Sequence, residues 1–143
     1  MKKIAIVYWS GTGNTRAMAE ALAGGVKDAG AEAVLVETSQ AKPDEVLAAD
    51  AIALGCPAMG AEVLEETDVE PFVADLCAKG VSGKALALFG SYDWGDGQWM
   101  RDWEERMKTA GGSLVAPGLT VHLEPDAVGL GACADLGKKL AAG

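Results

Sequence analysis

The chain has 143 residues, of which half are hydrophobic and only 6% aromatic, and its formal net charge is −9. This length and apolar content predict one folded domain over residues 1–143, not two domains or a disordered chain. The excess of acidic residues argues against nucleic-acid or anionic-membrane partners, because phosphate contacts need clustered lysines and arginines. Three widely spaced cysteines and one histidine predict neither a disulfide framework nor a metal site.

The beginning of the chain lacks the pattern of a targeting signal. Lys2 and Lys3 precede an apolar run of only six residues, 4–9, which is too short for the core of a secretory signal. No stretch of about eighteen apolar residues follows that could span a bilayer. We therefore expect a cytoplasmic protein without a membrane partner.

Short apolar runs alternate with helix-like segments along the whole chain. Strands are expected at 4–9, 33–36, 51–55, 84–90 and 113–122, the last interrupted at Pro117 and Gly118, and helices at 14–29, after Pro43, and at 71–79, 98–110 and 128–142. This alternation predicts an α/β fold, a parallel sheet of five strands with helices on both faces. In such sheets ligands bind beyond the carboxyl ends of the strands, so function is expected in the loops there.

The loop after the first strand is rich in glycine and hydroxyl groups. It consists of Ser10, Gly11, Thr12, Gly13, Asn14 and Thr15. A helix start that follows such a loop binds phosphate through backbone N–H groups and the helix dipole, although simple helix capping is the alternative. The loop has no lysine and no third glycine, so it matches neither nucleotide-triphosphatase nor dinucleotide motifs and favours a monophosphate. Glu37, at the end of the second strand, keeps a nicotinamide-binding protein open as an alternative.

The loops after the third and fourth strands could bind a flat ring. Residues 55–62 read GCPAMGAE and residues 90–97 read GSYDWGDG. Met59 and Trp94 could lie on the two faces of a heteroaromatic ring, since thioether and stacked aromatic contacts are favourable. The alternative is that both are ordinary core residues. Trp99 and Trp103 are expected in the core, because their spacing places them on one helix face.

The three loops resemble those of the short-chain flavodoxins, bacterial electron carriers with one noncovalent FMN. The similar segments are YWSGTGNT at 8–15, GCPAMG at 55–60, GSY at 90–92 and WGDG at 94–97. The resemblance extends from Lys3 to the final helix. It implies a doubly wound, five-stranded parallel sheet in the order 2-1-3-4-5 and a single FMN-binding domain.

The resemblance also implies roles for individual residues. Residues 10–15 would hold the FMN phosphate, and Met59 and Trp94 would flank the isoalloxazine ring. Glu62 would accept a hydrogen bond from flavin N3–H, and the Gly60–Ala61 peptide would flip when one electron converts the flavin to its semiquinone. The implied cofactor-binding set further includes Ala58, Ser91, Tyr92, Asp93 and Gly95.

Several positions depart from the family pattern or are expected to have no role in the chemistry. The departures are Pro57, Ala61, Asp93 and Arg16, which could alter FMN affinity or potentials. Cys56 is expected to be a packed thiol, and His122 a surface residue at a strand end with no further role.

Charge is concentrated around the expected ring site. Residues 62–105 contain eleven acids and three bases, which accounts for eight of the nine net negative charges. Such charge disfavours a second electron on a flavin, although it could also serve as a solvated face. We expect a monomeric, low-potential one-electron carrier, not an enzyme, that shuttles electrons between redox enzymes docking on an acidic face. The alternative on the same fold is a flavin-dependent NAD(P)H:quinone reductase.

Overall fold

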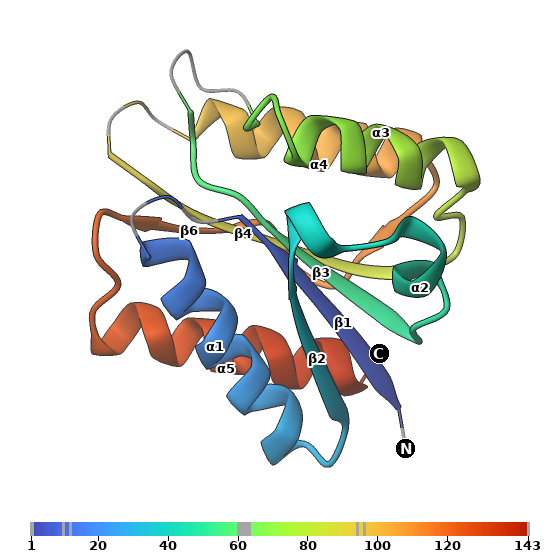
Figure 1. The fold of residues 1–143 in the computed structure, drawn as a ribbon. Coiled ribbons are helices and arrows are strands. Elements are labelled where there is room, and N and C mark those ends of the chain that lie inside the picture. The colour runs from blue at the N-terminus through green and yellow to red at the C-terminus, as the bar shows by residue number, and fades with distance from the viewer. Residues whose placement is uncertain are drawn as a thin grey trace.

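The computed structural model describes residues 2–9, 11, 13–59, 64–93, 95 and 97–142. Its strands are β1 (Lys3–Tyr8), β2 (Glu32–Glu37), β3 (Ala51–Gly55), β4 (Ala85–Tyr92), β5 (Ser113–Leu114) and β6 (Leu119–His122). They form one parallel sheet in the order β2-β1-β3-β4-β5, and β6 also pairs with β4 (Figure 1). The predicted fold class and strand order are confirmed.

The fifth strand of the prediction is two short strands, β5 and β6, beside the same neighbour. The ladder ends where the N–H of Val115 donates to the carbonyl of Leu86 at 3.0 Å. Pro117 has no N–H to continue it, and the N–H of Gly118 donates to the Glu104 carboxylate at 2.8 Å. The interruption expected at this point is therefore real, and β6 rejoins β4 beyond it.

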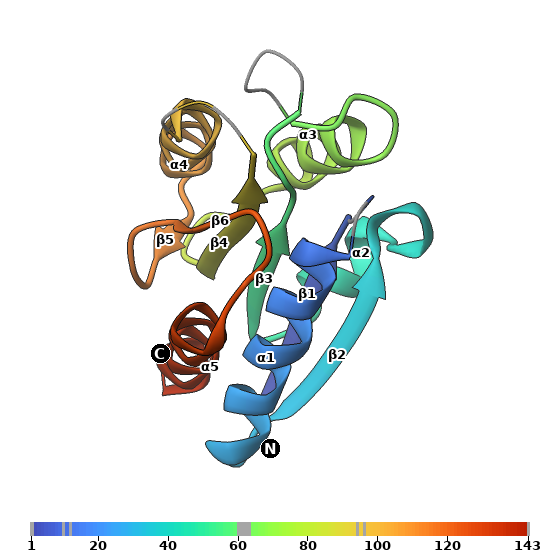
Figure 2. The same cartoon turned by 90° about the vertical axis from the view of Figure 1, so that its left-hand side faces the viewer.

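Helices cover both faces of the sheet. They are α1 (Asn14–Asp28), α2 (Pro43–Leu47), α3 (Val69–Lys79), α4 (Gln98–Thr109) and α5 (Ala127–Ala142), with a 3₁₀ turn, η1, at Thr38–Gln40. Helices α1 and α5 lie on one face, and α3 and α4 lie on the other (Figure 2). None of the helices within the described ranges is long and apolar enough to cross a membrane.

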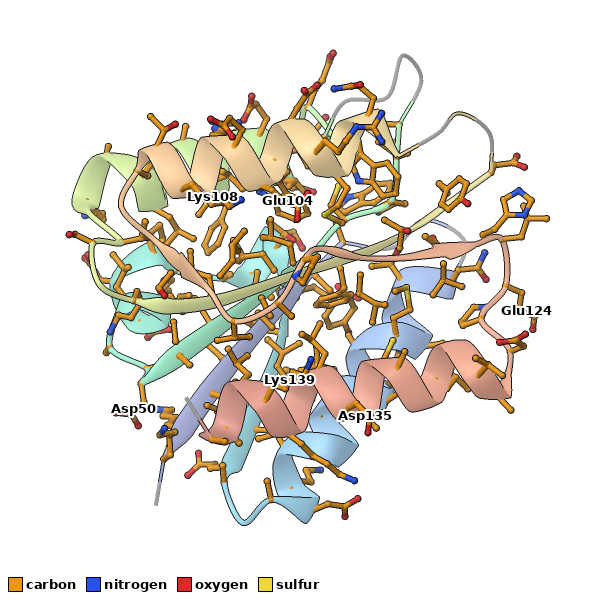
Figure 3. The ribbon with its side chains drawn as sticks, turned by 180° about the vertical axis from the view of Figure 1, so that it is seen from behind. Asp50, Glu104, Lys108, Glu124, Asp135 and Lys139 are labelled. Atoms are coloured by element: carbon orange, nitrogen blue, oxygen red, sulfur yellow. The ribbon has the colours of Figure 1, made fainter. Side chains whose placement is uncertain are left out.

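Alternate residues of the strands fill two separate cores. In β1, Ile4 and Ile6 pack toward α1 and α5, while Val7 packs with α3 and α4. The core under α4 includes Trp99 and Trp103, only 1% and 2% exposed, which confirms the expectation for both. Most charged side chains lie at the surface, as the exposed carboxylates and ammonium groups of α5 illustrate (Figure 3).

Helix α3 begins two residues before the position expected from Pro71. The buried Glu65 carboxylate accepts hydrogen bonds from the N–H groups of Thr67, Asp68 and Val69, at 2.8, 2.7 and 3.1 Å. A side chain upstream of the helix thus satisfies its first N–H groups, and Pro71 is tolerated in the first turn. This carboxylate fixes where the loop after β3 ends.

Candidate functional site at the carboxyl edge

The loops after β1, β3 and β4 converge on one cleft at the carboxyl edge of the sheet. The chain continues from β1 to β2 on one side and from β3 to β4 on the other, so the switch point of the strand order lies between the ends of β1 and β3. The cleft has a volume of about 290 Å³. Its lining residues are Trp9, Gly11, Asn14, Pro57, Ala58, Met59, Ser91, Tyr92, Asp93 and Leu123.

The cleft brings together predicted residues from all three loops. Those that line it are Gly11, Asn14, Ala58, Met59, Ser91, Tyr92 and Asp93. Gly13, Thr15 and Gly95 are described but are not part of the lining. Ser10, Thr12, Gly60, Ala61, Glu62 and Trp94 lie outside the described residues. The ring sandwich of Met59 with Trp94, the Glu62 hydrogen bond and the peptide flip therefore stay predictions.

Three lining residues were not in the predicted set. Trp9 directly follows β1, and its N–H donates to the Gly55 carbonyl at 3.0 Å, which joins it to the end of β3. Its position just before the glycine-rich loop was a usable signal. Pro57 is the second residue after β3. Leu123 follows β6, so no pattern in the three loops indicates it.

The start of α1 forms one end of the cleft. Gly13 is its N-cap with φ of 94°, a conformation that glycine adopts without penalty, and it has no side chain with which to cap the helix. Gly11 and Asn14 line the cleft on either side of it. Backbone N–H groups and the positive end of a helix dipole thus lie at the cleft, an arrangement suited to a phosphate.

A buried hydroxyl pair links this helix start to β4. Thr15 is fully buried, and its Oγ1 shares a hydrogen bond with Ser91 Oγ at 3.1 Å. The N–H of Ser91 points to the same oxygen at 3.4 Å. The Thr15 hydroxyl is therefore engaged with Ser91 inside the protein. Its predicted contact with a phosphate stays a prediction.

Cys56 anchors the loop after β3 to its surroundings. Its N–H donates to the Phe89 carbonyl at 3.1 Å, and its carbonyl accepts the indole N–H of Trp99 at 3.2 Å. Its sulfur accepts the N–H of Glu65 at 3.5 Å. A Cβ on Gly90 would lie 2.1 Å from the Cys56 carbonyl oxygen, so only glycine allows β4 to approach this closely.

Cys56 itself is a packed thiol, as predicted. It is fully buried, and burial raises its pKa to about 12, with the hydrogen bond from Glu65 acting in the opposite direction. A raised pKa keeps the thiol protonated near neutral pH, which is unfavourable for a nucleophile. Within the described ranges, no group of three histidine, cysteine or acidic side chains could hold a metal ion.

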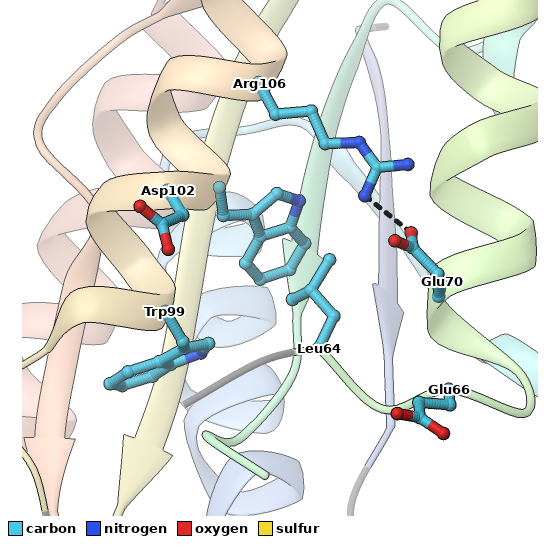
Figure 4. A pocket seen from close by; sticks show the side chains of 7 residues that line it. Leu64, Glu66, Glu70, Trp99, Asp102 and Arg106 are labelled. Carbon is cyan, nitrogen blue, oxygen red and sulfur yellow. Dashed lines mark hydrogen bonds and ion pairs between the residues drawn. The ribbon is translucent and has the colours of Figure 1, made fainter. Parts of the chain in front are cut away.

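A second hollow, of about 440 Å³, lies between α3 and α4 (Figure 4). Its apolar lining comes from Leu64, Trp99 and Trp103, and its charged lining from Glu66, Glu70, Asp102 and Arg106. The guanidinium of Arg106 is paired with Glu70. The ring centroids of Trp99 and Tyr92 are 5.8 Å apart, so one aromatic contact joins this acidic hollow to the cleft.

His122 is exposed at the end of β6, as predicted, and it also contacts two residues of the cleft wall. Its ring lies against Tyr92, and its Nε2 forms a hydrogen bond with the Asp93 carbonyl. Both partners line the cleft. The sequence pattern missed this contact because it depends on the pairing of β6 with β4.

The flavodoxin family model matches residues 6–137 of the chain. The chain belongs to the flavodoxin family. It is 51% identical to the flavodoxin of Clostridium beijerinckii over 136 residues, and this match covers 95% of the present chain and 97% of the relative. It is 44% identical over 138 residues to the flavodoxin of Megasphaera elsdenii, with 96% and 98% covered.

The fold also matches that of a solved flavodoxin. The solution structure of two-electron reduced Megasphaera elsdenii flavodoxin superposes with a TM-score of 0.87 and covers 98% of this chain and 99% of that one, at 44% identity. Flavodoxins are FMN-containing electron-transfer proteins rather than enzymes, so family membership confirms the predicted cofactor and class. The quinone reductase alternative gains no support from these relatives.

Proposed function

We infer that the chain is a low-potential one-electron carrier that holds one FMN in the cleft at the carboxyl edge. It acts as a single domain over residues 1–143, as a cytoplasmic monomer that serves redox enzymes rather than nucleic acid or membranes. The observation that carries this inference is the convergence of the three loops. A helix start lies at one end of the resulting cleft, and Trp9, Met59 and Tyr92 contribute to its walls.

The lining fits the two chemical parts of FMN. The phosphate belongs at the α1 start, where Gly11 and Asn14 meet the cleft and the remaining residues of the loop 10–15 supply hydroxyl and N–H donors. The ring belongs between the loops after β3 and β4, with Met59 and Trp94 on its faces and Glu62 at its N3–H. When bound, FMN supplies one-electron transfer in two steps, which none of the side chains of this cleft could perform.

The acidic surroundings lower the reduction potentials of a bound flavin. One carboxylate about 10 Å from an added electron, at an effective dielectric constant near 20, costs about 1–2 kcal/mol before salt screening. For a one-electron step, ~1.4 kcal/mol corresponds to about 59 mV. Residues 62–105 contain eleven acids and three bases, so several such contributions add. We therefore expect a low potential for the second reduction step, which makes the fully reduced protein a strong reductant.

The same charges favour partners with a basic surface. The hollow between α3 and α4 has three carboxylates and one guanidinium around an apolar floor, and it adjoins the FMN cleft through the contact between Trp99 and Tyr92 (Figure 4). A partner that docks over this hollow comes close to the cofactor. Complementary charge of this kind mainly raises association rates and makes them sensitive to salt.

The test is an anaerobic reductive titration of the FMN-loaded protein, followed by absorbance and potential. We expect two separate one-electron steps, with the second well below that of free FMN in the same buffer. A single two-electron step at the potential of free FMN would contradict the proposal. Rapid oxidation of NAD(P)H with a quinone and no other protein would instead support the reductase alternative.

A further inference from the structure

The end of β6 lies beside the loop that walls the FMN cleft. Strand β6 runs parallel to the second half of β4, with Tyr92 opposite His122 in the register. Immediately beyond this pair, β4 continues into the loop with Asp93, and β6 continues into Leu123. The two chain segments leave the sheet side by side at the carboxyl edge.

Three contacts join these two segments. His122 Nε2 lies 2.9 Å from the Asp93 carbonyl oxygen, and because a carbonyl only accepts, Nε2 carries the hydrogen. The His122 and Tyr92 rings have centroids 5.0 Å apart and planes inclined by 41°. The N–H of Leu123 donates to the Tyr92 carbonyl at 2.7 Å. Both residues held in this way line the cleft, whereas His122 does not.

The backbone at Leu123 adopts an unfavourable conformation in the middle of these contacts. Its φ is 59°, and no other residue except glycine has a positive φ in the described part of the chain. Left-handed backbone is costly for a residue with a Cβ and persists only where the surroundings hold it. Here the turn follows directly on the hydrogen bond to Tyr92 and places Leu123, 46% exposed, at the wall of the cleft.

We propose that His122 is a positioning residue for FMN. With the backbone of Leu123 it forms a clamp that holds Tyr92 and Asp93 at the ring end of the cleft. The proposal rests on the FMN site inferred above but concerns a side chain outside the cleft lining. The clamp contacts the wall of the ring site, so it influences how tightly the ring is held, and none of its three contacts involves the start of α1.

Three substitutions separate the two contacts of the imidazole. His122→Gln keeps an N–H donor for the Asp93 carbonyl, His122→Phe keeps a ring against Tyr92, and His122→Ala removes both. Thr120→Ala is the matched control, because Thr120 is also exposed and lies two residues earlier in the same strand. FMN and riboflavin dissociation constants are measured for each variant by flavin fluorescence.

We expect His122→Ala to weaken FMN binding about fivefold, the effect of losing roughly one hydrogen bond, with Gln restoring most of the affinity. Riboflavin binding should weaken by the same factor, because the clamp affects the ring and not the phosphate. In the apoprotein, amide hydrogen exchange at Leu123 should accelerate in His122→Ala, while the unfolding midpoint stays close to that of Thr120→Ala.

FMN affinity in His122→Ala equal to that of Thr120→Ala would overturn the proposal, as would a loss in Gln as large as in Ala. If His122→Ala does not fold, the comparison is between His122→Gln, which keeps the N–H donor, and His122→Phe, which lacks it. His122→Phe should then bind FMN more weakly than His122→Gln, and equal affinities would overturn the proposal. A wild-type protein that binds no FMN would instead refute the proposed function. The exchange rate at Leu123 would then still show whether His122 holds the loop.

Discussion

Thr15 Oγ1 and Ser91 Oγ share a buried hydrogen bond of 3.1 Å, although the two residues are 76 positions apart in the chain. The bond ties the first turn of α1, where we propose that the phosphate binds, to the end of β4, where we propose that the ring binds. The two parts of the proposed FMN site are therefore held in a fixed relation by a contact inside the protein.

Replacing Thr15 by valine tests this link. The change keeps the shape of the side chain but removes the partner of the Ser91 hydroxyl and N–H, which leaves buried polar groups unpaired. We expect the apoprotein to lose about 1–3 kcal/mol of unfolding free energy. Urea unfolding measures the loss, with Thr120→Val as the exposed control. Equal stability of the two variants would show that the pair contributes nothing.

Replacing Gly90 by alanine tests the close approach of β4 to the loop after β3. The new Cβ would lie 2.1 Å from the Cys56 carbonyl oxygen and 3.2 Å from the Trp99 ring, so the loop must shift. We expect a loss of about 1–3 kcal/mol and weaker FMN binding. Gly24→Ala in α1 is the control, because its Cβ would meet nothing within 4 Å and should stabilise the helix by about 0.5–1 kcal/mol. A Gly90→Ala protein as stable as wild type would contradict the packing argument.

Replacing Glu65 by glutamine tests how the start of α3 is held. Burial by itself raises the pKa of this carboxyl, but the N–H groups of Asp68, Val69 and Thr67 outweigh it and hold the pKa below its ordinary value. A lowered folded-state pKa means that the carboxylate stabilises the protein above the unfolded pKa, about 4.3, and that this contribution disappears as the pH falls through the folded pKa.

Glu65→Gln should therefore cost about 1–2 kcal/mol at pH 7 and progressively less below pH 4. Thermal unfolding of wild type and variant across this range measures the difference. Glu66→Gln is the control, because it removes the same charge from the neighbouring residue, which lines the hollow between α3 and α4. A difference between wild type and Glu65→Gln that stays constant from pH 7 to pH 3 would exclude the charged cap.

The proposed acidic docking face is tested with a pair of double variants of equal charge. Glu66→Gln with Asp102→Asn neutralises two carboxylates of the hollow between α3 and α4. Glu20→Gln with Asp135→Asn neutralises two exposed carboxylates on α1 and α5, the helices on the other face of the sheet (Figure 2). We expect the first pair to slow electron transfer to cytochrome c, a basic redox protein, severalfold at low salt, with the effect fading at high salt. Equal rates for both pairs would exclude local docking.

Most of the fold follows from local sequence patterns. Apolar runs separated by amphipathic segments predicted the parallel sheet, and Pro117 predicted the break between β5 and β6. The start of α3 was missed, because its cap is a glutamate upstream of the helix rather than the residue beside it. Helix ends depend on which side chain reaches the first N–H groups, and a local pattern does not contain that information.

The site was predictable where it follows directly on the strands. Gly11, Met59 and Asp93 come from loops whose positions the strand ends determine. His122 and Leu123 reach the same edge only because β6 pairs with β4 after the break in the fifth strand. That relationship joins segments distant in the chain, so the sequence indicated neither Leu123 in the cleft lining nor the contacts of His122 with it.

The most direct test of the account is a calorimetric titration of the apoprotein with FMN and, in parallel, with riboflavin. If the cleft holds the ring and the start of α1 holds the phosphate, FMN binds one to one and much more tightly than riboflavin, which lacks the phosphate. Absence of FMN binding, or equal affinities for the two flavins, would contradict it.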